Sequence, residues 1–140
     1  MTQLTNLLKD LISAQHMLRI LHWNVTGCHF NSTHQVFADY IDHIEDDIDA
    51  VSEMNIILGG NPVALDECTN NFDVELDTNT KYDSKDAYAK VVKIFNALIK
   101  DFTLACSEEK LLAAFRSELE SLQYYYIIEN AYKNVRRLDD

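Results

Sequence analysis

The sequence predicts an all-α fold, a four-helix bundle, and three observations support this class. The 140 residues include only 3 glycines and 1 proline, so long stretches contain no residue that ends a helix. Hydrophobic residues make up 47% of the chain and recur at helical spacing. A chain of this length can bury a hydrophobic core without disulfides or metals, and we expect residues 1–140 to form a single domain.

The first half of the chain predicts two helices joined by a short turn. Apolar residues follow a helical period from Leu4 to Val25, and Gly27 can end this first helix. A second helix extends to a break at residues 59–62, and it can be capped by Asn31, Ser32 or Thr33. Because the turn is short, the two helices should form an antiparallel hairpin.

The second half predicts a second hairpin after a long connection. Residues 63–82 are rich in Asn and Asp and have weak periodicity, with a short turn of helix expected around 63–68. Asp83 or Ser84 can cap a third helix. A break near Cys106 and Ser107 then precedes a fourth helix, expected from Leu111 to Val135. The connection of roughly 20 residues is long enough to run the length of a ~25-residue helix, so a crossover joins the second and third helices.

The charge and the cysteines narrow the class of protein. A formal net charge of -11 repels phosphate groups and attracts metal cations. The basic cluster of Lys133, Arg136 and Arg137 is followed, after one leucine, by two aspartates, so direct DNA binding is not expected. The 3 separated cysteines predict neither a disulfide framework nor a zinc cluster. No signal peptide or membrane span is visible, and we expect a cytoplasmic protein.

Four residues suggest a metal site. His22 lies near the end of the first helix and His34 near the start of the second, while Asp49 and Glu53 share one side of the second helix. Imidazole and carboxylate ligands together suit iron. His34 and Asp49 are ~22 Å apart along the helix, so all four residues can surround a metal only if a second copy packs antiparallel across a two-fold axis. The alternative is that the histidines are structural and the acids merely solvated.

The residues around this set resemble a known family. The run His22-Trp23-Asn24-Val25-x-Gly27, with the later Phe30, His34, Asp49 and Glu53, is similar to the signature of the Dps family of mini-ferritins. The match also continues through residues 58–62 and, more weakly, into residues 118–120 and Tyr124 of the last helix. The resemblance implies a ferritin-like four-helix bundle that assembles from two-fold dimers into a hollow dodecamer.

The same resemblance implies a chemistry. Iron(II) would be oxidised by hydrogen peroxide or oxygen at sites between subunits, and iron(III) stored inside the shell. His22 and His34 would be ligands from one subunit, with Asp49 and Glu53 from its partner. Trp23 would line this site, and the alternative for Trp23 is a plain core aromatic.

One position departs from the family pattern. The family has an acidic ligand one helical turn after the second histidine, and this chain has Ala38 there. The adjacent Asp39 points roughly 100° away. We therefore expect reduced or altered ferroxidase activity, and the alternative is a shell with impaired or lost activity that is structural or sequesters iron slowly. No glutamate is followed by histidine three residues later, which excludes the di-iron site that ferritins build within one bundle.

Three further features have more than one interpretation. The acidic run around His43 is either a solvated or shell-lining face or a place of iron nucleation, and it contains Asp42, Glu45, Asp46 and Asp47. The tyrosines at 124–126 cannot all face a helical core, so one or two should lie at a subunit contact; an electron-relay role stays open. By resemblance, an iron-entry pore near the last two helices has as candidate residues Asp101, Glu108 and Glu109.

Overall fold

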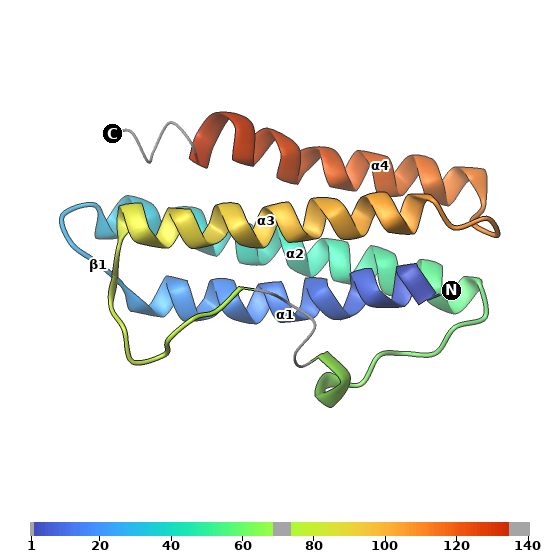
Figure 1. Cartoon of the computed structure of the whole chain (residues 1–140), viewed down its shortest axis with the longest axis horizontal. Coiled ribbons are helices and arrows are strands. Elements are labelled where there is room, and N and C mark those ends of the chain that lie inside the picture. The colour runs from blue at the N-terminus through green and yellow to red at the C-terminus, as the bar shows by residue number, and fades with distance from the viewer. Residues whose placement is uncertain (1, 69–73, 135–140) are drawn as a thin grey trace.

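The computed structural model contains four long helices that lie side by side (Figure 1). It describes residues 2–68 and 74–134, and the side chains up to residue 131. The four helices are α1 (Thr2–Asn24), α2 (Phe30–Ile57), α3 (Ser84–Cys106) and α4 (Ala113–Ile128), and a π-helical turn at Glu129–Asn134 continues α4. The predicted all-α class and four-helix bundle are confirmed.

The first hairpin has a shorter α1 and an earlier α2 than the sequence predicted. Strand β1 (Val25–Thr26) follows α1 directly, so α1 ends before Gly27, which turns the chain with a positive φ of 103°. The Phe30 amide donates to the Gly27 carbonyl at 3.2 Å, and α2 therefore begins at Phe30. The expected caps at 31–33 are wrong, because the preceding residue His29 occupies the N-cap position without a side-chain bond.

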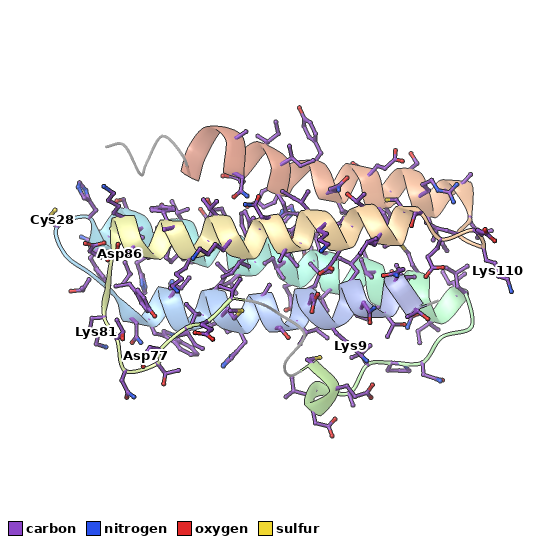
Figure 2. All side chains as sticks on the ribbon, viewed as in Figure 1. Lys9, Cys28, Asp77, Lys81, Asp86 and Lys110 are labelled. Atoms are coloured by element: carbon purple, nitrogen blue, oxygen red, sulfur yellow. The ribbon has the colours of Figure 1, made fainter. Side chains whose placement is uncertain are left out.

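The long crossover runs along α1 from one end of the bundle to the other (Figure 1). Its 3-10 turn η1 (Leu65–Cys68) confirms the expected short helical segment, and the Ser13 hydroxyl donates to the Cys68 carbonyl to hold it on α1. Strand β2 (Tyr82–Asp83) then pairs parallel with β1, with Val25 opposite Tyr82. Figure 2 shows Asp77 and Lys81 on the part of the crossover that leads to β2. The crossover is thus fixed near both of its ends.

The second hairpin follows the prediction closely. The Asp83 carboxylate accepts a 2.8 Å hydrogen bond from the Asp86 amide and caps α3, as expected. Helix α3 ends at Cys106, and α4 begins at Ala113, two residues after the expected Leu111. The expected end of the last helix at Val135, and the arginines of the basic cluster, lie outside the described residues.

The core lies between the helices and contains several polar side chains. Its largest fully buried residues are aromatic: Tyr40, Tyr126, Phe37, Phe95 and Phe102. The buried polar residues are Asp10, Thr33, Asp47, Asn55, Glu129 and Asn130. Asp47 therefore does not belong to a solvated acidic face as the sequence suggested; it is only 2% exposed because it points at the core and binds Tyr126. Within the described ranges, no helix is long and apolar enough to cross a membrane.

Candidate metal centre

Two imidazole rings lie face to face where α1 ends and α2 begins. The ring centroids of His22 and His34 are 3.6 Å apart with an interplanar angle of 17°. Phe30 stacks on the outer side of His34 with centroids 4.9 Å apart. The antiparallel hairpin predicted from the sequence therefore brings these two histidines together.

Reciprocal hydrogen bonds fix the orientation of both rings. His22 Nδ1 is 2.9 Å from the backbone oxygen of His34, and His34 Nδ1 is 2.9 Å from the backbone oxygen of His22. A carbonyl oxygen can only accept, so each Nδ1 carries a proton and donates it. In the neutral rings this leaves both Nε2 atoms with a free lone pair, which is the arrangement that metal-binding histidines usually adopt.

The surroundings of His22 favour its neutral form. Partial burial is the main cause that lowers the pKa of His22, and the positive charges of His34 and Arg19 lower it further. The hydrogen bond to the His34 carbonyl opposes this shift. Since a metal binds the neutral ring, a lowered pKa keeps His22 available as a ligand at more acidic pH.

The two carboxylates of the predicted set lie farther along α2 and are exposed. Asp49 borders a depression of about 280 Å³ together with Glu45 and Asp46. Glu53 borders an apolar groove of about 590 Å³, whose walls include Ile12 and Ile56. These acids face outward from the bundle beside apolar surface.

One chain does not assemble the four predicted residues around a single point. Within residues 2–68 and 74–131, no group of three or more His, Cys, Asp or Glu side chains is placed to hold a metal ion. His22 and His34 form one half of a ligand set. Asp49 and Glu53, one helical turn apart, have the donors of another half.

The structure bears on two residues near the histidines whose roles the sequence left open, Trp23 and Ala38. Trp23 is 61% exposed, so it is not a core aromatic of this chain. Ala38 is half-buried one turn after His34 and brings no donor atom, and the neighbouring Asp39 accepts a 3.1 Å hydrogen bond from Gln35 instead. Asp39 therefore does not replace the missing acid within this chain.

Sequence reasoning missed the backbone carbonyls that orient the two rings and the effect of Arg19. The carbonyl bonds depend on how two helix ends meet, and no residue type signals them. Arg19 lies three residues before His22, and this spacing on one helix face could have indicated that its charge acts on His22.

Comparison with known proteins identifies the family. Residues 1–114 match the family described as the ferritin-like domain. The chain belongs to the ferritin-like family. This ferritin-like chain is also 29% identical over 100 residues to the DNA protection during starvation protein of Helicobacter pylori, an alignment that covers 71% of the chain and 69% of that protein.

Solved structures share the fold over nearly the whole chain. Antigen TpF1 from Treponema pallidum has a TM-score of 0.88 at 19% identity, covering 99% of this chain and 90% of that one. A Dps protein from Bacillus brevis has a TM-score of 0.72 at 20% identity, covering 99% and 91%. The resemblance to the Dps mini-ferritins that the sequence predicted is confirmed.

Proposed function

We propose that this ferritin-like chain oxidises iron(II) at sites shared by two subunits and stores the iron(III) product inside a Dps-like shell. The observation that supports the proposal most is the His22–His34 pair. Its two Nε2 atoms are unprotonated in the neutral rings, and the rings are held in place before any metal arrives. Iron-storage protection of the cell is the corresponding family-level role.

The second half of the ligand set would come from a two-fold partner. If two α2 helices pack antiparallel with His34 beside the partner's Glu53, the imidazoles of each subunit face the exposed carboxylates of the other, and the same site forms twice. Charge favours this pairing, because Arg19 lies near the histidines while Glu45 and Asp46 accompany Asp49. The same proposal includes the assembly of these two-fold dimers into a hollow dodecamer.

The proposed reaction balances without a further cofactor. Each iron(II) ion gives up one electron, and a peroxide molecule accepts two electrons and two protons, breaks its O–O bond and forms two waters. The imidazoles and carboxylates bind the iron ions that supply these electrons, and carboxylate oxygens favour the iron(III) product because it is the harder cation. The acidic depression beside Asp49 would attract iron(II) to the site.

Ala38 favours a second candidate function. With no donor atom at this position, one iron ion at each site would have fewer ligands than in the family pattern. A shell that binds iron without oxidising it efficiently, and that is structural or sequesters iron slowly, is the alternative that follows.

The rate of iron(III) formation, followed by absorbance after iron(II) and peroxide are added, separates these candidates. We expect His34→Ala to lower the rate toward that of buffer, and His16→Ala, which removes an exposed histidine elsewhere on α1, to leave it unchanged. Ala38→Asp should raise the rate if the site is short of one ligand. A wild-type rate equal to buffer, unchanged in His34→Ala, contradicts the ferroxidase proposal, and a large gain in Ala38→Asp then identifies the impaired shell.

A further inference from the structure

The three consecutive tyrosines of α4 have three different surroundings. Tyr124 is 62% exposed. Tyr125 is half-buried, and its ring stacks on His43 with centroids 3.5 Å apart and an angle of 14°. Tyr126 is fully buried between α2 and α3. The sequence left open whether these tyrosines relay electrons. Because their surroundings differ, each residue can be considered separately.

Of the three tyrosines, Tyr126 is the one whose hydroxyl donates a hydrogen bond to a buried carboxylate among the described residues. Its hydroxyl donates a hydrogen bond to Asp47 Oδ2, and Asp47 is 2% exposed. His43 Nε2 lies 3.3 Å from the same oxygen. Burial, followed by the charge of Asp47, raises the pKa of Tyr126 well above its ordinary value, so loss of the proton to solvent is disfavoured.

A hydrogen bond from a phenol to a carboxylate couples proton and electron loss. A buried tyrosine that loses an electron becomes a strong acid, and its proton must then move to a neighbouring base. Asp47 is already in contact to receive it, so no water has to enter the core. Without such a base the cationic ring would remain in an apolar environment, which is costly.

Aromatic rings connect Tyr126 to the surface. Its ring centroid is 5.3 Å from that of Tyr125, and Tyr125 stacks on the partly exposed His43. On the core side, Phe95 lies 5.1 Å from Tyr126, and Tyr40 lies 5.0 Å from Phe95. An electron therefore has short steps between Tyr126 and the protein surface.

We propose that Tyr126 is a redox-active tyrosine that delivers one electron to strong one-electron oxidants of the hydroxyl-radical class. The O–H bond of Tyr126 breaks, its proton forms an O–H bond on Asp47, and the electron passes through Tyr125 to the oxidant at the surface. A hydroxyl radical that gains this electron, with a proton from solvent, becomes water. Tyr126 is left as a neutral radical, with its proton on Asp47.

This activity is separate from the proposed ferroxidase and needs no iron. The chain also contains a matched comparison residue. Tyr40 is similarly buried and donates to a buried carboxylate, that of Glu129, at 3.3 Å. Its ring centroid is 6.5 Å from that of Tyr125. Because Tyr40 does not bind Asp47 and lies farther from Tyr125 than Tyr126 does, removal of the Tyr40 hydroxyl should have little effect on radical formation.

The test uses metal-free, full-length protein with a ruthenium tris-bipyridine photosensitiser and persulfate, which generate a surface oxidant by a light flash. Electron paramagnetic resonance should record a slowly decaying neutral tyrosyl radical in the wild type. We expect Tyr126→Phe and Asp47→Asn each to lose the slowly decaying signal. The Tyr40→Phe and Tyr124→Phe variants should retain it.

Wild-type radical yield and lifetime in Tyr126→Phe would overturn the proposal, as would equal loss in Tyr40→Phe. Circular dichroism shows whether each variant is folded. If Tyr126→Phe does not fold, a Tyr40→Phe/Tyr124→Phe double variant tests the assignment instead. Its radical should keep the wild-type lifetime, and its decay should show a deuterium solvent isotope effect. Loss of the radical in that variant would contradict the assignment to Tyr126.

Discussion

The substitution Asp10→Asn tests a pair of acidic side chains between α1 and α3, of which Asp10 is buried and Asp101 half-buried. Asp10 is 7% exposed and faces Asp101, and each carboxyl has one oxygen without a hydrogen-bond partner among the described residues. Burial raises the pKa of Asp10 to about 8, and the hydrogen bond and negative charge of Asp101 add to this effect. Asp10 therefore keeps its proton near neutral pH and donates it to Asp101. By resemblance, Asp101 was a candidate residue of an iron-entry pore. Its carboxyl instead shares a hydrogen bond with Asp10.

The sign of the pH dependence follows from the raised pKa. Between pH 3.8, the ordinary pKa of Asp10, and about pH 8, the folded chain binds a proton that the unfolded chain has released. The stabilisation is fully present below this range and is lost as the pH rises through about 8. While Asp10 is fully protonated in the folded chain, one extra bound proton makes the free energy of unfolding fall by about 1.4 kcal/mol per pH unit. This slope flattens as Asp10 loses its proton near pH 8, so the fall between about pH 6 and pH 8 is about 2 kcal/mol.

In Asp10→Asn the amide donates to Asp101 at every pH, so this part of the dependence should disappear. Urea unfolding followed by circular dichroism from pH 5.5 to 9, at one protein concentration, measures the effect. Asp42→Asn is the matched control, because it makes the same aspartate-to-asparagine change at an exposed position of α2. A slope for Asp10→Asn that equals the slopes of the wild type and of Asp42→Asn would refute the shared proton.

Three other perturbations have defined outcomes. His22 should titrate below the pKa of a free histidine in an NMR pH series, and a normal midpoint would show that partial burial does not favour its neutral form. Asp83→Ala should lower the free energy of unfolding by about 1 kcal/mol through loss of the α3 cap, and an unchanged denaturation midpoint would contradict that role. Phe102→Ala should cost about 3–5 kcal/mol in the same assay because the ring is fully buried, and a cost below about 1 kcal/mol would mean that the core closes over the gap.

Local signals were sufficient to predict most of the fold. Helical spacing of apolar residues predicted the four helices, and the capping residue Asp83 marked the start of α3. The β1–β2 pair was missed because strands of two residues have no sequence period. The start of α2 was misplaced because the turn at Gly27 fixes it, whereas Ser and Thr near a helix start are only a statistical preference.

The sequence also predicted the pairing of His22 and His34, since a tight hairpin must bring them together. It did not predict the environment of Asp47, which was grouped with its acidic neighbours. Tyr40, Ile44, Asp47 and Val51 follow a helical spacing of four, three and four residues, so one face of α2 contains Asp47 among core residues. That spacing was the available signal. The partner of Asp47, Tyr126, is 79 residues away and could not be inferred locally.

The exposed turn between α1 and α2 has a practical consequence. Cys28 is at its outer tip, whereas Cys68 is buried and Cys106 is half-buried (Figure 2). Burial also raises the pKa of both inner thiols, which slows their reaction with alkylating reagents. A maleimide fluorophore should therefore attach first at Cys28, six residues from each imidazole. Quenching of that dye by a paramagnetic ion would give an optical record of occupancy in the native chain, without engineering a new attachment point.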